Sequence, residues 1–362
     1  MAQDTFNFIV NKSQLAETKL EQATLADLNE GEVLFSIDRF ALTSNNITYG
    51  VAGDMLNYWQ FFPCKEGWGR IPVWGIAKVV QSRCSEVKVD SLYYGYYPMS
   101  KHLIVSPVKV GEHGFSDGAE QRQGLSPVYN QYTLMTKETG FLPEHYNHQI
   151  VYRPLFMTSF ILDDYMLDND FFGAEQIILS SASSKTAFGT AFQLQGRDKK
   201  IIGLTSGTNK AFVEKLGLYD QVLTYQEVGE IDKTISTAYI DMSGNRRVLA
   251  EVHHHLKENL VCSCGVGITH WDALDGEDPR SLPGAAPSMF FAPDQIQKRT
   301  KEWGGEVLQA RIGVAWDKFV KFVDQHVQFK ESLAPKAIDA TYQILIKGPA
   351  PDKAYVVRFP EN

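Results

Sequence analysis

Beyond residue 175, three successive segments of this chain each place a short apolar strand directly before an amphipathic helix. The strands are IILSS, KIIGLTS and TAYIDMSG, and the helices follow Lys185, Ser206 and Gly244. Two more buried strands are expected further on, in NLVCSCGVG (259–267) and SMFFAP (288–293). Strands that alternate with helices predict an α/β fold, with a doubly wound parallel sheet and right-handed crossovers.

The first 150 residues have a different, β-rich pattern. Apolar and polar residues alternate in GEVLFSIDRFAL (31–42), and VWGIAKVVQS (73–82) and HLIVSPVKV (102–110) are further expected strands. Gly, Pro and Asn separate these segments, which predicts an antiparallel sheet or a barrel. The pattern changes near Arg153, because PLFMTSFILDDYML (154–167) has helical periodicity and its proline suits a first helical turn.

Composition and charge exclude several classes of protein. The chain is 44% hydrophobic, as globular proteins are, and its net charge of -8 argues against a general nucleic-acid binder. No apolar run approaches the ~18 residues of a membrane span, and the polar N-terminus lacks the apolar core of a secretory signal. The four cysteines have neither metal nor disulfide spacing, so we expect a reduced, cytoplasmic protein.

The loop after the first strand has the composition of a phosphate site. Ser183, Ser184, Lys185 and Thr186 open a helix, whose N-terminus attracts anions through its N–H groups and dipole. Their hydroxyl and ammonium groups can contact a pyrophosphate in place of the usual glycines, of which only Gly189 is present. The alternative is a serine that caps a helix and binds nothing.

The ends of the following strands supply further candidates. In dinucleotide-binding folds the second strand ends at the adenosine ribose, where an acidic residue selects NAD. This chain has Ser206 and Lys210 there, which suits the 2′-phosphate of NADP, although a solvated surface lysine fits the pattern equally well. Asp241 and Gly265 follow the next strands, at the carboxyl edge where ligands bind in open α/β sheets.

Taken in their order along the chain, the N-terminal strands and the later strand–helix units resemble the medium-chain dehydrogenase/reductase superfamily. The resemblance is strongest to its zinc-free quinone-oxidoreductase-like and enoyl-reductase-like branches. Most narrowly, the chain resembles the bacterial family DUF2855. GEVLFSIDRFALTSNNITYG resembles the first catalytic-domain strand, and GPAPDKAYVVRF resembles the returning last strand. Where zinc enzymes carry a cysteine and a Gly-His-Glu, this chain has Thr43 and Val73-Trp74-Gly75, and it has no four-cysteine cluster. The resemblance therefore implies a protein without bound zinc.

The resemblance also implies a domain organisation and a cofactor. It implies a GroES-like β-barrel catalytic domain (1–152), a Rossmann NADP-binding domain (153–295) and a C-terminal segment (296–362) that returns to the catalytic domain. NADP(H) is implied because NADP-dependent members carry a lysine and, about fifteen positions later, a tyrosine, which here are Lys210 and Tyr225. A homodimer formed through the edge of the nucleotide-domain sheet is a further implication.

These features favour a zinc-independent, NADPH-dependent reductase that delivers hydride to a small molecule, an activated alkene, quinone or carbonyl, between the two domains. In the superfamily, the segment that carries Thr43, Asn46 and Tyr49 faces the nicotinamide, and a hydroxyl or amide there would stabilise an enolate oxygen. Tyr58 and Tyr97 are further candidates, and any of these tyrosines alternatively only packs the barrel. Two other functions stay open: a catalytically idle NADP-binding redox sensor or scaffold, and an NADP-binding protein with another ligand such as an acyl thioester.

Overall fold

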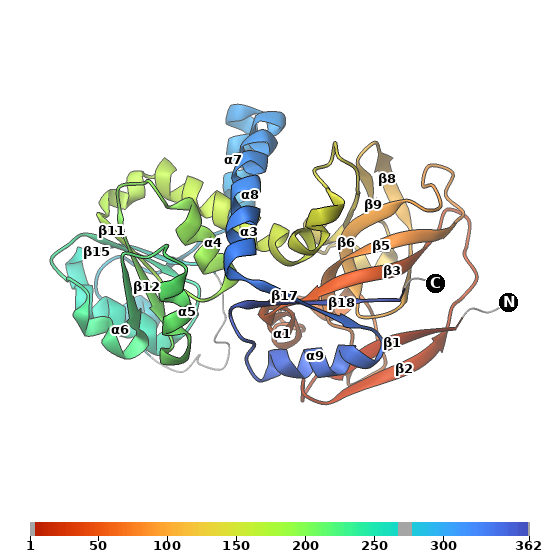
Figure 1. Ribbon diagram of the computed structural model, residues 1–362, viewed down its shortest axis with the longest axis horizontal. Coiled ribbons are helices and arrows are strands. Elements are labelled where there is room, and N and C mark those ends of the chain that lie inside the picture. The colour runs from red at the N-terminus through yellow and green to blue at the C-terminus, as the bar shows by residue number, and fades with distance from the viewer. Residues whose placement is uncertain (1–3, 267–276, 361–362) are drawn as a thin grey trace. The chain divides into compact units, whose positions relative to one another are not determined.

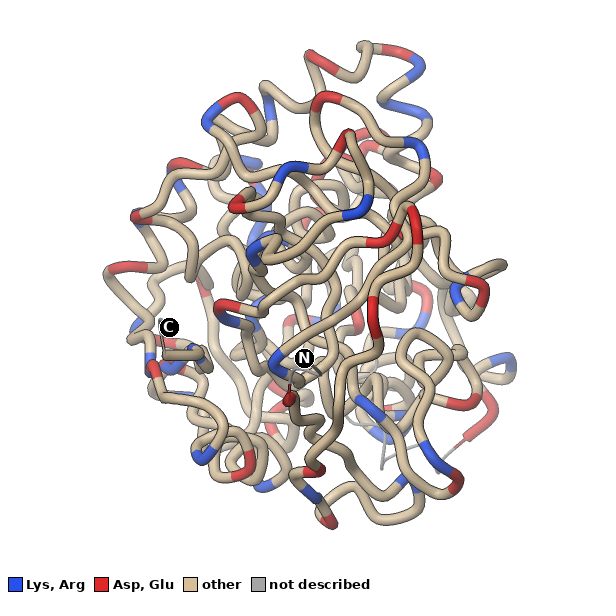
Figure 2. Tube along the Cα trace, turned by 90° about the vertical axis from the view of Figure 1, so that its right-hand side faces the viewer, with Lys and Arg blue, Asp and Glu red and all other residues tan. Residues whose placement is uncertain are grey.

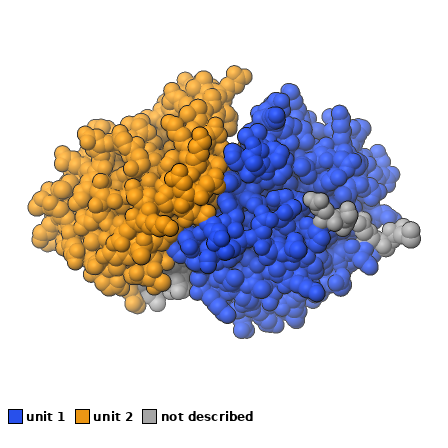
Figure 3. All heavy atoms as spheres, in the orientation of Figure 1, with its two compact units in different colours: residues 1–151, 328–362 blue, residues 152–327 orange. Residues whose placement is uncertain are grey.

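The computed structural model describes residues 4–266 and 277–360 and divides the chain into two compact units (Figures 1 and 3). Unit 1 comprises residues 1–151 and 328–362, and unit 2 comprises residues 152–327. Unit 1 first ends at residue 151, whereas the sequence predicted the end of the first domain at residue 152. Unit 2 extends to residue 327, beyond the expected 295, because the helices that follow residue 291 belong to it.

Unit 1 contains two sheets within the described residues. The larger has the order β17-β18-β3-β5-β6-β10-β9-β8, with β7 paired to β3, and only β17 and β18 run parallel. Its strands are β3 (Val33–Leu42), β5 (Pro72–Ser82), β6 (Leu92–Pro98), β7 (His102–Val105), β8 (Pro107–Gly111), β9 (Gly114–Asp117), β10 (Gln131–Leu134), β17 (Gln328–Leu333) and β18 (Lys353–Arg358). The smaller sheet, of order β2-β1-β4, comprises β1 (Asp4–Asn11), β2 (Thr18–Thr24) and β4 (Trp68–Gly69).

The expected strand over 102–110 is two strands. The Asp117 carboxylate accepts the N–H of Ser106 at 3.0 Å, so the chain leaves β3 at this point and pairs with β9 instead. The α-helices of unit 1 are α1 (Ser44–Val51), α2 (Pro127–Asn130) and α9 (Lys336–Ile346), and its 3₁₀ turns are η1 (Tyr58–Gln60), η2 (Glu120–Arg122) and η3 (Pro143–His145).

Helix α3 (Tyr146–Asp168) crosses from unit 1 into unit 2 and begins earlier than expected. The expectation that Pro154 occupies a first turn is wrong, since it lies inside the helix. A proline there removes one backbone hydrogen bond. The preceding turns are nevertheless helical because they are packed: Gln149 and Ile150 are buried, and the Gln149 amide donates to the Gly140 carbonyl at 3.0 Å.

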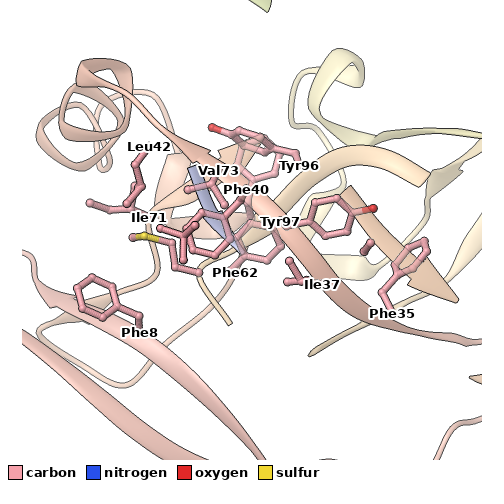
Figure 4. Packing of buried hydrophobic residues seen from close by; sticks show 14 of the residues in the cluster. Phe8, Phe35, Ile37, Phe40, Leu42, Phe62, Ile71, Val73, Tyr96 and Tyr97 are labelled. Carbon is pink, nitrogen blue, oxygen red and sulfur yellow. The ribbon is translucent and has the colours of Figure 1, made fainter. Parts of the chain in front are cut away.

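Strand β6 explains the tyrosine-rich sequence LYYGYYP. Side chains alternate between the two faces of a strand, and Figure 4 shows Tyr96 and Tyr97 leaving β6 in different directions. The Tyr97 hydroxyl donates to the Tyr93 carbonyl at 2.9 Å, on the face that also carries Gly95. A Cβ at Gly95 would lie 2.4 Å from the ring of Tyr132, so this glycine makes room for a buried aromatic side chain.

Unit 2 contains the expected parallel sheet. Its order is β13-β12-β11-β14-β15-β16, and each strand runs parallel to its neighbours. Its strands are β11 (Gln176–Leu179), β12 (Lys200–Thr205), β13 (Gln221–Thr224), β14 (Thr237–Asp241), β15 (Leu260–Gly265) and β16 (Ser288–Met289). Strand β13 was not expected, and Gly267, the end of the expected strand over 259–267, lies outside the described residues.

Helices accompany this sheet in the alternating order that the sequence predicts (Figure 1). The α-helices of unit 2 are α4 (Lys185–Gln193), α5 (Lys210–Lys215), α6 (Arg246–Leu256), α7 (Ala292–Trp303) and α8 (Gly305–His326), besides most of α3. The 3₁₀ turns are η4 (Asp170–Gly173), η5 (Gly207–Asn209), η6 (Tyr225–Glu230), η7 (Lys257–Asn259) and η8 (Pro279–Ser281). Helix α8 packs on α3 and α4 through Phe319, whose ring lies 4.7 Å from Phe156 and 6.2 Å from Phe188.

Charged residues of both signs are interspersed along the trace (Figure 2). We find no helix among the described residues that is long and apolar enough to cross a membrane.

Candidate cofactor site and aromatic cluster

The loop Ser180–Ser184 joins β11 to α4 at the carboxyl end of the parallel sheet. Ser181 has φ 50°, in the left-handed region that favours glycine. Its carbonyl accepts the N–H of Ser184 at 2.7 Å, and the N–H of Ala182 donates to Leu204 on the next strand at 2.9 Å. The loop therefore makes a tight turn without the usual glycines, and Ser181 bears the conformational cost of that turn.

Neighbouring strands supply partners for this loop. The Asn209 amide donates to the Ser183 hydroxyl at 3.0 Å, and the Tyr219 hydroxyl donates to the Ala182 carbonyl at 2.9 Å. On β12, a Cβ at Gly203 would lie 2.9 Å from the Tyr219 ring and 3.1 Å from the Ala182 methyl. These contacts hold the loop close against the sheet.

The first turn of α4 carries the remaining predicted phosphate contacts. Ser184 is the N-cap, and its hydroxyl oxygen accepts the N–H of Ala187 at 3.3 Å. That bond occupies a lone pair and leaves the hydroxyl proton able to donate. Lys185 and Thr186 are half-buried in the turn where a helix has no internal acceptor for its N–H groups.

Tyr225 meets the loop from the end of β13. Its hydroxyl accepts the N–H of Ser181 at 3.1 Å. Burial raises the pKa of Tyr225 to about 12, and the bond from Ser181 opposes that rise. Tyr225 is therefore a neutral phenol at physiological pH, and it supports the strained residue of the loop.

Lys210, the first residue of α5, is paired with an acid that the sequence analysis did not single out. Its ammonium group lies 2.9 Å from a carboxylate oxygen of Glu227, which also accepts the N–H of Thr224 at 2.7 Å. The bond from Thr224, followed by the one from Lys210, lowers the pKa of Glu227 to about 2. Ser206 lies four residues before Lys210, at the cap position of η5.

Asp241 organises the end of β14. One of its carboxylate oxygens accepts hydrogen bonds from the hydroxyls of Ser180 at 2.6 Å, Ser243 at 2.7 Å and Tyr239 at 3.1 Å. The same oxygen also accepts the N–H of Ser243 at 2.9 Å and that of Gly244 at 3.2 Å. Asp241 therefore ties the loop after β11 to the loop after β14 and lies at the predicted edge.

Two predicted cofactor residues are in close contact with other side chains. A Cβ at Gly189 would lie 2.7 Å from the Ser159 hydroxyl on α3, so this glycine allows two helices to approach. A Cβ at Gly265 would lie 2.8 Å from the Met289 sulfur on β16. The structure thus brings Ser183, Ser184, Lys210, Tyr225 and Asp241 to the ends of adjoining strands, whereas Gly189 is buried within α4.

The three predicted catalytic residues lie on or beside α1 in unit 1. Thr43 is the N-cap of this helix, and its N–H donates to the Asn46 side-chain oxygen at 2.7 Å. The Asn46 amide nitrogen donates to the Pro72 carbonyl at 2.8 Å, and the residue is buried. One end of the Asn46 side chain therefore caps α1, and the other end holds this helix on β5.

Tyr49 belongs to an aromatic cluster formed by Tyr49, Tyr58, Phe61, Trp74, Tyr96 and Tyr129. Ring centroids are 4.5 Å apart for Tyr49 and Tyr58, and 5.8 Å apart for Tyr49 and Tyr96. Burial, followed by Tyr58, raises the pKa of Tyr49, and side-chain hydrogen bonds with Trp74, Asn45 and Tyr96 oppose the rise. The Tyr49 phenol keeps its proton at neutral pH. Tyr97, by contrast, faces the other side of β6.

Several residues of both regions escaped the sequence analysis. Glu227, Tyr219 and Ser180 touch the candidate cofactor loop, and Trp74 and Tyr96 join the aromatic cluster. The strand register that brings them together is not visible in a single sequence. Among residues 4–266 and 277–360 there is no group of three or more His, Cys, Asp or Glu side chains that could hold a metal ion, and the absence of zinc stays a prediction.

Solved structures with the same fold belong to the medium-chain dehydrogenases/reductases. CurA from Vibrio vulnificus, in complex with NADPH, matches at 13% identity with a TM-score of 0.62 over 100% of both chains. A provisionally assigned NADPH:quinone reductase from Mesorhizobium loti matches at 9% identity with a TM-score of 0.63 over 99% of both chains. A mutant enoyl thioester reductase from Candida tropicalis matches at 12% identity with a TM-score of 0.54, over 98% of this chain and 100% of the other.

At such identities these likenesses show the fold, a GroES-like unit with a Rossmann unit. No curated protein matches the chain in sequence. The family model described as "Protein of unknown function (DUF2855)" matches residues 40–351, and the chain belongs to this family.

Proposed function

We propose that this protein is an NADPH-dependent reductase that transfers hydride to an activated alkene, a quinone or a carbonyl compound. The observation that carries the proposal is the loop Ser180–Ser184, which makes a glycine-like turn at the N-terminus of α4 although it contains no glycine. Helix N-termini bind phosphate groups through their N–H groups and dipole. This loop lies at the carboxyl edge of a parallel sheet, where dinucleotides bind.

The residues around the loop fit a phosphorylated dinucleotide. Ser183, Ser184 and Thr186 supply hydroxyl groups for the pyrophosphate, and Lys185 supplies a positive charge. Lys210 and Ser206 follow the next strand and suit the 2′-phosphate of the adenosine ribose. Asp241 and Tyr225 hold the loop in its conformation.

NADPH, when bound, supplies the hydride, which carries two electrons. The substrate must also gain one proton to become a saturated carbonyl compound, a hydroquinone or an alcohol. A protonated tyrosine can supply it, and Tyr49 is our candidate because it lies on the segment that faces the nicotinamide in the superfamily. Burial keeps its phenol protonated at neutral pH, since it raises the pKa of Tyr49. Thr43 and Asn46 position the helix that carries Tyr49.

The solved structures of the same fold support this proposal. The CurA structure contains NADPH, and the others are described as a quinone reductase and an enoyl thioester reductase. The names quinone reductase and enoyl thioester reductase both imply reduction of a double bond that is conjugated with a carbonyl. The proposal extends that chemistry to this chain through its own loop and its own tyrosines.

A second candidate is a catalytically idle NADP-binding protein that acts as a redox sensor or scaffold. The loop Ser180–Ser184 motivates this reading, because it lacks the glycines that the dinucleotide fingerprint normally carries. Turnover separates the two functions, since only the reductase oxidises NADPH when an acceptor is added.

The first test is a fluorescence titration of the purified protein with NADPH and with NADH. NADPH should bind more tightly, and Lys210→Ala should weaken NADPH binding about tenfold while NADH binding changes little. Lys215→Ala is the matched control, because Lys215 is an exposed lysine at the other end of α5. Absence of NADPH binding would refute both candidate functions.

Turnover is then followed as loss of NADPH absorbance with enones and with quinones. The reductase proposal expects oxidation with at least one of these classes and slower oxidation by Tyr49→Phe. Cofactor binding without oxidation by any acceptor would leave the sensor as the function.

A further inference from the structure

Three consecutive backbone N–H groups of the loop after β11 have acceptors of two different kinds. The N–H of Ser180 donates to a carbonyl of β14 at 3.1 Å, and that of Ala182 donates to a carbonyl of β12 at 2.9 Å. The N–H of Ser181, between them, donates to the hydroxyl of Tyr225 at 3.1 Å. Buried N–H groups need an acceptor, and here a side chain supplies it. Tyr225 thus completes the backbone hydrogen bonding of this loop.

Ser181 is also the residue of this loop with a left-handed backbone, at φ 50°. A residue with a Cβ keeps this conformation only where its surroundings hold it, whereas glycine adopts it without strain. The side chains of Ser181 and Tyr225 are hydrogen-bonded as well, so the two residues are joined twice. Tyr225 therefore holds Ser181 in a conformation in which a glycine would need no support.

Tyr225 reaches Ser181 across an intervening strand. It is the first residue of η6 and directly follows β13, whereas the loop follows β11, and β12 lies between these two strands. Neighbouring strands are about 4.8 Å apart, so the side chain extends about 10 Å past the carboxyl end of β12. Its ring packs against the buried cluster that contains Leu204 and Val228. The tyrosine is therefore fixed by its ring and by its hydroxyl.

The same 3₁₀ turn holds Lys210 at a separate place. Glu227, two residues after Tyr225, pairs with the Lys210 ammonium group at 2.9 Å. Lys210 offers its charge to the proposed 2′-phosphate site, whereas the Tyr225 hydroxyl is engaged by Ser181. The resemblance to NADP-dependent enzymes pairs these two residues, but their contacts in this protein lie at different parts of the proposed cofactor site.

We propose that Tyr225 is a positioning residue for the pyrophosphate loop and not a ligand of the 2′-phosphate, and that it stabilises at Ser181 the turn that a glycine would otherwise provide. The loop in this conformation presents the N-terminus of α4 to the pyrophosphate. NADPH and NADH share the pyrophosphate, so Tyr225 controls the affinity for both and does not discriminate between them. This inference rests on the proposed function and deepens it.

The test compares fluorescence titrations with NADPH and with NADH. We expect Tyr225→Phe to weaken the binding of both about three- to tenfold, so that the ratio of the two Kd values changes less than about twofold. Lys210→Ala should weaken the binding of NADPH alone. A Tyr225→Phe protein that loses affinity for NADPH alone would show a contact with the 2′-phosphate, and unchanged affinity for both would show that the hydroxyl is not needed. Either result overturns the inference.

Ser181→Gly provides a rescue experiment. Because glycine holds the turn by itself, adding Tyr225→Phe to Ser181→Gly should weaken the binding of either cofactor by about twofold or less. An equal loss from Tyr225→Phe in both backgrounds would show that the two residues act independently, against the inference.

Fragments of the cofactor locate the effect. ADP-ribose contains the pyrophosphate without a 2′-phosphate, and adenosine 2′-monophosphate contains the 2′-phosphate without a pyrophosphate. By calorimetry, Tyr225→Phe should weaken the binding of ADP-ribose and leave that of adenosine 2′-monophosphate unchanged, whereas Lys210→Ala should do the opposite. Loss of adenosine 2′-monophosphate binding in Tyr225→Phe would overturn the inference.

Tyr342→Phe is the matched control, because it removes a buried tyrosine hydroxyl that donates to the Leu15 carbonyl at 3.0 Å in unit 1. This variant should have a lower Tm but unchanged Kd values for both cofactors. An equal loss of cofactor affinity in Tyr342→Phe and Tyr225→Phe would mean that general destabilisation is the cause, which contradicts a positioning role.

Failure of the proposed function would look different. Cofactor binding that depends on Tyr225 as expected, without oxidation of NADPH by any acceptor, would leave this role in place and remove the reductase. Normal NADPH-dependent turnover with unchanged cofactor affinity in Tyr225→Phe would keep the reductase and remove this role. A wild-type protein that binds neither cofactor would remove both.

Discussion

The ammonium group of Lys210 lies 2.9 Å from a carboxylate oxygen of Glu227, at the place proposed for the 2′-phosphate of NADPH. Both side chains are about one-third exposed, at 31% and 32%. A phosphate at this position must therefore share Lys210 with an existing negative charge. Glu227 stays charged at neutral pH, because the N–H of Thr224 and then Lys210 hold its pKa at about 2.

Replacing that charge should strengthen cofactor binding. Glu227→Gln keeps an oxygen that can accept the N–H of Thr224 but removes the repulsion of the 2′-phosphate. We expect the Kd for NADPH to fall about two- to fivefold at low salt, with little change for NADH. Glu230→Gln, an equal change of charge at the end of η6, is the control. An unchanged preference for NADPH over NADH in Glu227→Gln would contradict this placement of the phosphate.

The contact of Gly189 with Ser159 makes a prediction about packing. A Cβ at Gly189 would lie 2.7 Å from the Ser159 hydroxyl and 3.3 Å from its Cβ. Gly189→Ala should therefore lower the free energy of unfolding by about 1–3 kcal/mol. Ser159→Ala removes the closer atom, so the double variant should recover part of the loss, and urea unfolding measures the coupling. Additive losses in the double variant would show that this contact is not the cause.

Arg299 on α7 makes a prediction about charge burial. Its guanidinium binds Asp164 at 2.7 Å and Asp168 at 2.9 Å on α3, and the side chain is 11% exposed. Arg299→Met leaves these carboxylates without their main partner and should cost about 3–5 kcal/mol in urea unfolding. Lys298→Met removes a more exposed partner of Asp168 and should cost less than about 1 kcal/mol. Equal costs would mean that burial does not set the strength of this network.

His102 makes a prediction about pH. Burial, and then Lys101, lowers the pKa of His102 to about 4, and its Nδ1 lies 3.1 Å from the Thr5 hydroxyl. The unfolded chain takes up the proton near pH ~6.5, before the folded chain does, so acid favours unfolding between these two values. The Tm should therefore fall more steeply from pH 7 to pH 4.5 in the wild type than in His102→Asn. His113→Gln, at an exposed histidine, should follow the wild type.

The parallel sheet could be predicted because its signals are local. Strands such as Ile177–Leu179 are short apolar runs followed at once by helical periodicity, and the order of the units matched a known superfamily. Strands β13 and β17 were missed because both are short and carry polar residues. Pro154 misled the prediction of α3, because buried contacts of Gln149 and Ile150 keep the preceding turns helical despite the proline.

The candidate cofactor residues could be found in the sequence because each follows a strand directly, and the carboxyl ends of parallel strands share one edge. The partners, backbone conformation and packing role of each of these residues are visible only in the tertiary structure. Only the fold shows that Glu227 pairs with Lys210, that Ser181 adopts a glycine-like φ and that Gly189 serves helix packing.

By itself, the sequence determined the two kinds of architecture, their order along the chain and the chemical types near the sheet edge, because these follow from residue periodicity and composition over short stretches. Only the tertiary structure decided that Trp74 and Tyr96 are register partners, so that their side chains share one face of the sheet. Strand register sets which side chains share a face, and it is fixed by contacts between residues far apart in the chain.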